Sequence, residues 1–302
     1  MNPILALIIA NIIWGAAPPI FKFALENIPP FTLGFLRFFI PALLLLPFIR
    51  NFKVRDISPK DWLELILGSF FGITINIAFF FLALQKTQSI NAPIIASSGP
   101  VFLYILSIIF LKEKAKLKVF AGMMCALIGV VFIILSPVLF EGKSFSLGEF
   151  TGNLFLVIST FGAVLHPLLY KNILKKMDTM VVTCLSFFIG SIAFLPMVVG
   201  ELQSWNVMML DFRGIVGILF GAFLSSLAAY SLYNYGLSKI STEEIGLFTY
   251  IDPIVTVLIA APLLHEYPTV HFFLGAILVF GGIFIAEGRI HWHPFHKIRF
   301  KM

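Results

Sequence analysis

The pattern of apolar and polar positions divides most of the chain into ten apolar stretches, separated by short polar connections. Each stretch is close to the roughly 17 to 25 residues that a helix needs to cross a bilayer. The pattern therefore predicts an all-α polytopic membrane protein with ten transmembrane helices and no room for a soluble domain. The expected helices cover 3–24, 31–49, 63–84, 90–111, 117–137, 152–170, 179–199, 214–237, 245–264 and 270–288.

The placement of charge predicts how these helices are oriented. Charged residues make up only 12% of the 302 residues, and the net charge is +6. With the N-terminus placed inside, sixteen of the 21 lysines and arginines fall in connections on the cytoplasmic side. This follows the positive-inside rule, so we expect a multi-pass plasma-membrane protein with both termini in the cytoplasm. The basic charge thus reports topology, and we expect no nucleic-acid partner.

Two parts of the sequence resemble each other at constant spacings. An offset of 153 takes Pro100 to Pro253 and Glu113 to Glu266, and an offset of 149 relates the first two helices of each half. Because each half holds an odd number of helices, the second copy must enter the membrane in the opposite orientation. We therefore predict two inverted five-helix repeats, an arrangement typical of secondary transporters. They cover 1–138 and 149–288, and a basic, histidine-containing tail follows at 289–302.

Several motifs are shared with a known family of carriers. They are Trp14-Gly15 in the first helix, Arg37 followed by aromatic residues in the second, and the paired segments SGPVFLYILSIIFLKEK and YIDPIVTVLIAAPLLHEY. With these motifs the whole chain resembles the EamA-like branch of the drug/metabolite transporter superfamily. The resemblance implies a carrier of amino acids, other small metabolites, nucleotide-like compounds or amphipathic toxins, often directed outward. It also implies a central cavity lined by the first, third and fourth helices of each half.

Helical spacing supplies candidate residues for such a cavity, because residues three or four apart share a helix face. Matched prolines predict helix kinks beside the binding site. The alternative interpretation is helix packing, in which small and polar side chains let membrane helices approach and hydrogen-bond. The cavity candidates are Asn11, Trp14, Asn76, Tyr104, His166, Tyr170, Tyr230, Tyr233, Asn234 and Asp252, and the kink candidates are Pro18, Pro100, Pro167 and Pro253.

Asp252 is the strongest single candidate. A carboxylate at the centre of a membrane helix costs about 2.5 to 3.5 kcal/mol, which disfavours a position facing lipid. Desolvation favours its neutral form, which suits a proton-binding or cation-binding role, although an aspartate also bonds readily to a loosened backbone amide. His166 is compatible with proton transfer or with a plain hydrogen bond between helices.

The other charged groups are interpreted as structural. Lys22 and Arg37 are expected near the outer surface, where long side chains anchor helix ends. Glu113 and Glu266 end their helices on opposite sides of the membrane and are expected to pack or pair at a gate. The three histidines of HWHPFH in the tail are interpreted as membrane anchoring rather than as a metal site.

We predict a secondary transporter, and an exporter, for a small organic solute such as an amino acid, an amine or a purine-like compound. Its partners are the solute, the lipid bilayer and, in one version, a coupling proton. No cofactor is expected, because no ATP-binding loop of the form G-x-x-x-x-G-K-[ST] occurs. Proton-coupled import of a small cation or metabolite is the main alternative. An intramembrane enzyme has no hydrolase or paired-histidine motif to support it and no need of the inverted repeat. A non-transporting scaffold would predict no ligand-dependent stabilisation in detergent.

Overall fold

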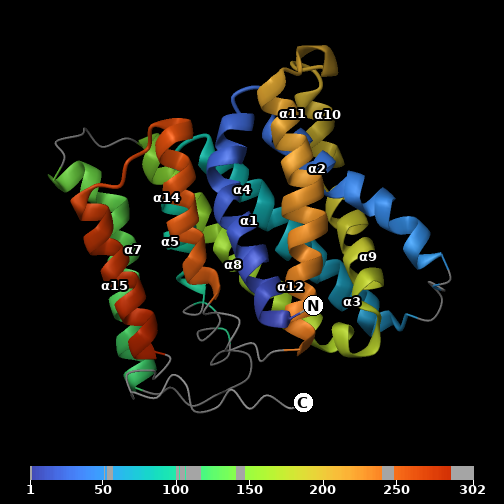
Figure 1. The fold of residues 1–302 in the computed structure, drawn as a ribbon, viewed down its shortest axis with the longest axis horizontal. Coiled ribbons are helices and arrows are strands. Elements are labelled where there is room, and N and C mark those ends of the chain that lie inside the picture. Colours follow the sequence, from blue (N-terminus) through green and yellow to red (C-terminus); the bar gives the residue numbers. More distant parts are fainter. Residues whose placement is uncertain are drawn as a thin grey trace. The chain divides into compact units, whose positions relative to one another are not determined.

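Every element of secondary structure in the described ranges is a helix, and no strand occurs in them. The computed structural model describes residues 2–50, 52, 57–99, 102, 106, 117–140, 147–239 and 248–286. Within these ranges the predicted all-α class is confirmed (Figure 1). The expected helix at 90–111 is described only at 90–99, 102 and 106, and this part includes α5, Asn91–Ala96.

The helices follow the apolar stretches of the sequence closely. Several stretches are built from two or three helical segments in succession. The segments η3 and η5 are π-helical and η1 and η6 are 3₁₀, while the 3₁₀ segment η4 lies in the connection between α10 and α11. In chain order the remaining elements are α1 (Pro3–Ala24), α2 (Pro30–Leu45), η1 (Leu46–Ile49), α3 (Pro59–Ser69), η3 (Phe70–Ile75), α4 (Asn76–Leu84), α7 (Leu117–Phe140), α8 (Leu147–Lys176), α9 (Thr179–Ile192), α10 (Leu195–Glu201), η4 (Val207–Met209), α11 (Phe212–Leu219), η5 (Phe220–Ala228), α12 (Ala229–Lys239), η6 (Phe248–Tyr250), α14 (Ile251–Leu264) and α15 (Val270–Ala286).

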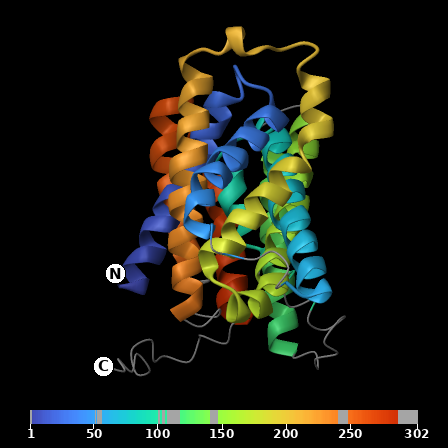
Figure 2. The same ribbon diagram turned by 90° about the vertical axis from the view of Figure 1, so that its right-hand side faces the viewer.

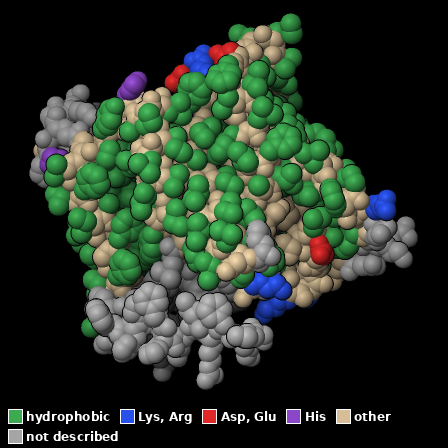
Figure 3. All heavy atoms as spheres, viewed as in Figure 1, with side chains coloured by type: hydrophobic (Ala, Val, Ile, Leu, Met, Phe, Trp, Pro, Cys, Tyr) green, Lys and Arg blue, Asp and Glu red, His purple; other side chains and the backbone are tan. Residues whose placement is uncertain are grey.

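The helices have the length and surface of membrane spans. Five continuous helical stretches in the described part are long and apolar enough to cross a bilayer, and a sixth is reached if α9 and α10, bent by 45°, form one span. Large apolar side chains such as those of Leu219, Ile254 and Leu258 are exposed. Figure 3 shows apolar side chains covering the flanks of the helices, while charged side chains gather toward the helix ends. Lipid is the solvent that such a surface requires.

The described chain forms two compact units, each built from elements of both predicted repeats. The first unit comprises residues 1–96 and 146–268, and the second comprises 97–145 and 269–302.

In the second unit, α7 and α15 pack through small residues. A Cβ added at Gly129 would lie 2.7 Å from the main-chain nitrogen of Val279 and 2.8 Å from the carbonyl oxygen of Gly275. Only a residue without a side chain permits this approach, and small residues are what membrane helices use to bring their backbones together.

The contacts of this pair are reciprocal. A Cβ added at Gly282 would meet the main-chain nitrogen of Ala126 and the carbonyl oxygen of Gly122. An offset of 153 converts this set of contacts into the set around Gly129. Cys125 also donates from its Sγ to the carbonyl oxygen of Leu278, its own equivalent, at 3.5 Å. Each helix therefore presents the same surface to the other.

We expect Gly282→Ala to lower the free energy of unfolding by about 1 to 3 kcal/mol, because the backbone of α7 cannot yield to the added methyl group. Thermal unfolding in detergent measures the loss. Gly281→Ala is the matched control, since a Cβ added at Gly281 meets nothing within 4 Å, and we expect it to stay within about 0.5 kcal/mol of the wild type. Equal unfolding temperatures for the two variants would contradict this packing.

In the first unit, α1 packs against α14 and α12, α8 packs against α3 and α4, and α2 packs against α9 (Figure 1). The α2–α9 contact pairs aromatic rings at equivalent positions of the two repeats. The ring centroids of Phe38 and Phe187 are 5.3 Å apart, and those of Phe39 and Phe188 are 6.1 Å apart. Both pairs are related by the offset of 149.

A carboxylate from another helix fixes the start of α2. Glu201, at the end of α10, accepts hydrogen bonds from the main-chain nitrogens of Phe31 (2.9 Å) and Thr32 (2.6 Å). The residue before the helix, Pro29, makes no capping bond. Glu201 thus satisfies free amides at the positive end of the α2 dipole. The connection from α10 to α11 passes over this end of the unit (Figure 2).

Candidate functional site

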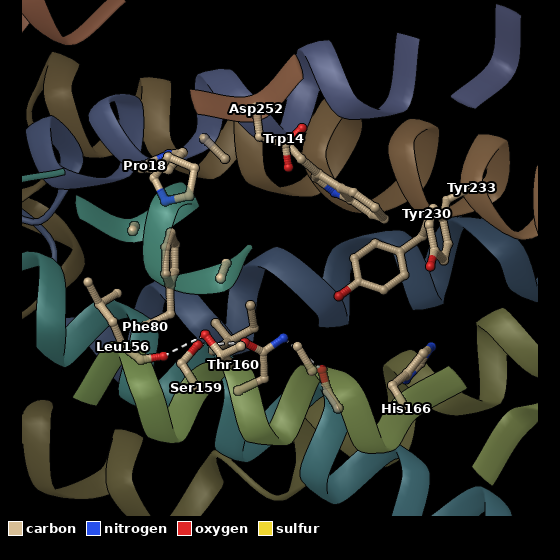
Figure 4. Close-up of a pocket in the computed structure, with 18 of the residues that line it drawn as sticks. Trp14, Pro18, Phe80, Leu156, Ser159, Thr160, His166, Tyr230, Tyr233 and Asp252 are labelled. Atoms are coloured by element: carbon tan, nitrogen blue, oxygen red, sulfur yellow. Dashed lines mark hydrogen bonds between the residues drawn. The ribbon is translucent and has the colours of Figure 1, made fainter. Parts of the chain in front are cut away.

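A cavity of about 260 Å³ lies inside the first unit. Its walls come from α1, α2, η3, α4, α5, α8, α12 and α14. Figure 4 shows Trp14 and Asp252 on one wall and Ser159 and Thr160 on the facing wall. The lining residues are Trp14, Ala17, Pro18, Arg37, Gly72, Asn76, Ile77, Phe80, Ala92, Pro93, Ala96, Leu156, Ser159, Thr160, Ala163, His166, Tyr230, Tyr233 and Asp252.

Two prolines within α1 shape the first wall. A proline inside a helix leaves the carbonyl four residues earlier without its usual donor. Pro19 therefore frees the carbonyl of Gly15, and Thr256 on α14 donates its hydroxyl to that oxygen at 2.6 Å. A Cβ at Gly15 would lie 2.8 Å from the carbonyl oxygen of Asp252, so α1 and α14 touch directly here. This contact sets Asp252 beside the α1 wall.

Three aromatic side chains form a continuous surface at one end of the cavity. The ring of Trp14 lies 5.3 Å from that of Tyr230, edge to face, and 5.0 Å from that of Tyr233. The indole nitrogen of Trp14 donates to the carbonyl oxygen of Ser225 at 3.0 Å, within the π-helical segment η5. The Ser225 carbonyl of η5 therefore positions the indole, and π-helical turns of this kind are frequent at functional sites.

Asp252 lies in the first turn of α14, immediately after the 3₁₀ turn η6. A helix N-terminus favours a carboxylate, because the macrodipole is positive there. Its Oδ1 atom is buried and has no hydrogen-bond partner in the described part of the chain. Pro253 follows in the same turn, where a proline costs no helical hydrogen bond. Asp252 thus has an acceptor atom that the described residues leave unsatisfied.

His166 lies on the opposite side of the cavity. Its ring packs 4.2 Å from that of Tyr170 and 6.2 Å from that of Tyr230, and a Cβ at Gly72 would clash with it. Its Nδ1 atom is buried without a hydrogen-bond partner among the described residues. Like Asp252, it offers an unused polar atom at the cavity.

Asn76 and Ser159, in contrast, satisfy each other. Ser159 donates to the Asn76 Oδ1 atom at 2.7 Å, and the Asn76 amide donates to the carbonyl of Gly72 at 3.1 Å. That carbonyl belongs to η3, the π-helical segment at the position equivalent to η5. Thr160 returns its hydroxyl to the carbonyl of Leu156 at 2.8 Å. These groups give the wall polarity without an unpaired charge.

Arg37 corrects an expectation. It was expected near the outer surface as a helix-end anchor, yet its side chain is only 4% exposed and forms part of the cavity wall. Helical spacing alone does not predict how deeply the Arg37 side chain is buried. An arginine within a predicted membrane helix carries the same signal that singled out Asp252, namely a charge kept away from lipid.

A network of hydrogen bonds lies one helical turn beyond the cavity. Lys22 Nζ is 2.6 Å from Glu266 Oε1 and donates to the carbonyl of Thr87 at 2.7 Å. Glu266 Oε2 accepts from the main-chain nitrogen and the hydroxyl of Ser89, both at 2.7 Å, and from the nitrogen of Ile90 at 3.4 Å. The expected pairing of Glu266 is therefore present.

The same network extends to α8. Thr87 donates its hydroxyl to Asn153 Oδ1 at 2.9 Å, and Asn91 donates to both at 3.2 Å. Asn153 lies one turn before Leu156 on α8, and Asn91 directly precedes the cavity residue Ala92. We call the residues Lys22, Thr87, Ser89, Asn91, Asn153 and Glu266 the end network.

Three predicted cavity residues lie elsewhere. Tyr170 is buried and bonded through its hydroxyl to Ser69 (2.6 Å) and Ser186 (2.7 Å). Asn11 donates to the carbonyl of Leu7, and Asn234 donates to the hydroxyl of Thr183. Tyr170 and Asn234 therefore join helices, while the bond of Asn11 stays within α1, and none of the three lines the cavity.

The remaining candidates divide between the wall and the undescribed part of the chain. Trp14, Asn76, His166, Tyr230, Tyr233 and Asp252 all line the cavity, as does Pro18. Tyr104, Pro100 and Glu113 lie outside the described residues, as does the HWHPFH tail. The helix α8 runs through position 167, whose side chain is outside the description.

The repeat would have found one residue that spacing missed. Phe80 on the cavity wall is the equivalent of Tyr233 under the offset of 153. Ile77 and Tyr230 form a second equivalent pair, and Ala17 and His166 form a third under the offset of 149. Both repeats therefore supply the wall from corresponding positions.

Apolar helices with lipid-facing flanks and an internal cavity that carries a few polar groups define an integral membrane protein of the carrier type. Residues 1–135 and 150–287 match the model of the EamA-like transporter family. The chain belongs to this family and is a transporter.

Individual relatives align over nearly the full chain. An uncharacterized transporter of Archaeoglobus fulgidus is 26% identical over 290 residues, which cover 95% of this chain and 98% of the relative. A probable amino-acid metabolite efflux pump of Escherichia coli is 24% identical over 306 residues, covering 98% and 97%. A crystal structure of a protein with 18% identity matches with a TM-score of 0.62 over 94% of this chain and 96% of that one, which supports the fold alone.

Proposed function

We propose that the protein is a secondary transporter that exports small organic metabolites such as amino acids, amines or purine-like compounds. The observation that carries this proposal is the cavity, whose wall combines aromatic rings with polar atoms of Asp252 and His166 that have no partner among the described residues. Ligand sites are typically apolar pockets with a few convergent polar groups. A buried acceptor left unsatisfied by the protein is a natural place for a ligand donor.

The size of the cavity favours a small solute. Its volume of about 260 Å³ lies just below the roughly 300 to 1,000 Å³ of pockets for drug-sized ligands. Trp14, Tyr230 and Tyr233 offer ring faces that suit an apolar body or a cationic group. A single amino acid or a compound of similar size fits these requirements.

The transport cycle that we propose is alternating access of two inverted repeats, 1–138 and 149–288, in a ten-helix protein. The reciprocal α7–α15 contacts and the Phe38–Phe187 pair support a two-fold relation between the repeats. Transporters built this way bind the solute where the repeats meet and expose the site to each side in turn.

We propose that transport is directed out of the cell. We also propose that the protein lies in the plasma membrane with both termini, and the 289–302 tail, in the cytoplasm. The names of two relatives as probable amino-acid metabolite efflux pumps support export. The positive-inside distribution of lysine and arginine supports the orientation. In this proposed orientation, the end of α1 lies on the outer side of the membrane together with the end network.

A second candidate is proton-coupled import of a small cation or metabolite. Asp252 and His166 favour it, because both are titratable groups at the same cavity and each has a buried atom without a partner among the described residues. Transport measured in vesicles of known orientation separates the two directions.

A thermal-shift screen in detergent tests the proposed function. A transporter with this cavity is expected to gain about 2 to 3 kcal/mol of stability from its solute at a concentration 100-fold above the dissociation constant. The panel holds amino acids, amines and purines, with sugars as a chemically unrelated set. Stabilisation by none of the metabolites would favour a scaffold and would remove the proposal.

A further inference from the structure

Arg37 is the unexplained charge of the cavity. It lies in the middle of α2 with only 4% of its surface exposed, and it lines the cavity. Charged groups at membrane depth are costly and persist where they meet a partner or a functional site. The partner of Arg37 therefore decides what the residue is for.

The described protein partners of Arg37 are neutral. Its Nε atom donates to the hydroxyl of Ser226 at 3.1 Å, and its Nη2 atom donates to the hydroxyl of Ser225 at 2.9 Å. The guanidinium carbon lies 4.7 Å from the ring centre of Phe21 and 5.0 Å from that of Phe38. These contacts orient the guanidinium. They do not neutralise it, and no ion pair in the described part of the chain includes it.

The guanidinium has donors to spare. An arginine carries five N–H donors in a planar fork that matches a carboxylate with two parallel hydrogen bonds. Two of the five are occupied by the serine hydroxyls, and Nη1 makes no hydrogen bond to any residue that the structure describes. Both serines belong to η5, whose Ser225 carbonyl also holds Trp14. The fork is thus fixed relative to the aromatic surface of the cavity.

A carboxyl group faces the same cavity, and a cationic group of a solute would favour its ionised form. Asp252 lines it as well, and its Oδ1 atom is unpartnered among the described residues. Arg37 and Asp252 form no ion pair with each other. Among the described residues the cavity therefore presents a guanidinium without an ion-pair partner and a carboxyl group with an unpartnered oxygen, with aromatic rings along its wall.

We propose that the solute is a zwitterionic amino acid, with its carboxylate bound by Arg37 and its ammonium group directed to Asp252. This inference rests on the proposed function and narrows it, because an amine or a purine would leave the guanidinium without a counter-charge. The aromatic surface of Trp14, Tyr230 and Tyr233 then receives the solute's side chain.

Dissociation constants for matched compounds test the assignment. L-leucine and L-phenylalanine are compared with the amines that lack the carboxylate, 3-methylbutylamine and 2-phenylethylamine, on purified protein in detergent. The wild type is expected to bind at least one of the amino acids about 10- to 100-fold more tightly than its amine. Arg37→Met should reduce that ratio to about 1, and Arg37→Lys should retain part of it, because lysine keeps the charge without the fork.

Arg213→Met is the matched control. Arg213 pairs with Asp211 and Glu26 at 2.8 Å, outside the cavity, and its replacement should leave the ratio unchanged. If Arg37→Met does not fold, Arg37→Lys decides, and an unchanged ratio in that variant overturns the role of Arg37. Wild-type protein that binds an amine or a purine but neither amino acid overturns the zwitterion and leaves the proposed function standing. Failure to bind any metabolite overturns both.

Discussion

Asp252→Asn is expected to weaken binding of an amine-bearing solute by about 10- to 100-fold and to slow its transport accordingly. The carboxylate lines the cavity with an unpartnered oxygen, so it is free to meet the ammonium group of a solute, and charge-assisted hydrogen bonds of this kind are roughly twice as strong as neutral ones. An asparagine keeps the shape and loses the charge. Binding and uptake into vesicles measure the two effects.

The same variant has a signature in its pH dependence. A proton and a solute ammonium compete for one carboxylate, so binding to the wild type should weaken as the pH falls through the range in which Asp252 takes up a proton. In Asp252→Asn this dependence should disappear. An unchanged pH profile would remove both the ammonium contact and any coupling through Asp252.

Asp211→Asn is the matched control for this substitution. Asp211 caps α11 by accepting from the main-chain nitrogens of Arg213 at 2.8 Å and Gly214 at 3.4 Å, away from the cavity. Hydrogen bonds from the Arg213 side chain lower the pKa of the Asp211 carboxyl, so it stays ionised at neutral pH. We expect Asp211→Asn to leave binding and its pH profile unchanged.

Lys22→Met is expected to reduce the transport rate by about 5- to 150-fold. It removes the cation from the end network and leaves Glu266, whose side chain is 8% exposed, with an uncompensated charge. Breaking a buried pair costs about 3 to 5 kcal/mol, and we expect about 1 to 3 here because Lys22 is 28% exposed. A shift of 1.4 kcal/mol between two conformations changes their ratio tenfold. Vesicle exchange and thermal unfolding report the two consequences.

Two comparisons separate the end network from charge in general. Lys60→Met removes an exposed lysine 3.9 Å from Glu64. It should change the free energy of unfolding by no more than about 0.5 kcal/mol and leave the transport rate nearly unchanged. The exchange Lys22→Glu with Glu266→Lys should not restore transport, because the amides of Ser89 and Ile90 need an acceptor at position 266. Full recovery in the exchanged variant would mean that the pairing alone matters.

Apolar length was enough to predict the helices. The expected helix at 3–24 is α1, and that at 270–288 is α15, Val270–Ala286. A run of apolar residues in lipid has few alternatives to a helix, because each backbone amide must be satisfied within its own segment. The repeat could be found because prolines and glycines recur at constant offsets in the two halves of the sequence.

Helical spacing was less reliable for the side chains. The candidates Tyr230, Tyr233 and Asn234 all lie in α12, where the neighbours Tyr233 and Asn234 point about 100° apart around the helix axis. The two tyrosines reach the cavity, while Asn234 bonds to Thr183. Asn11 and Tyr170 differ for another reason, because a helix in a bundle has several buried faces and periodicity does not rank them.

Solute counterflow in proteoliposomes tests the central claim most directly, namely that this cavity carries an amino acid across the membrane by alternating access. Vesicles loaded with unlabelled L-leucine or L-phenylalanine receive a trace of the labelled amino acid outside. The account predicts transient accumulation of label above equilibrium, at rates lowered at least about tenfold in Arg37→Met and unchanged in Arg213→Met. Labelled amino acid that only equilibrates, or accumulates equally with Arg37→Met, would contradict it.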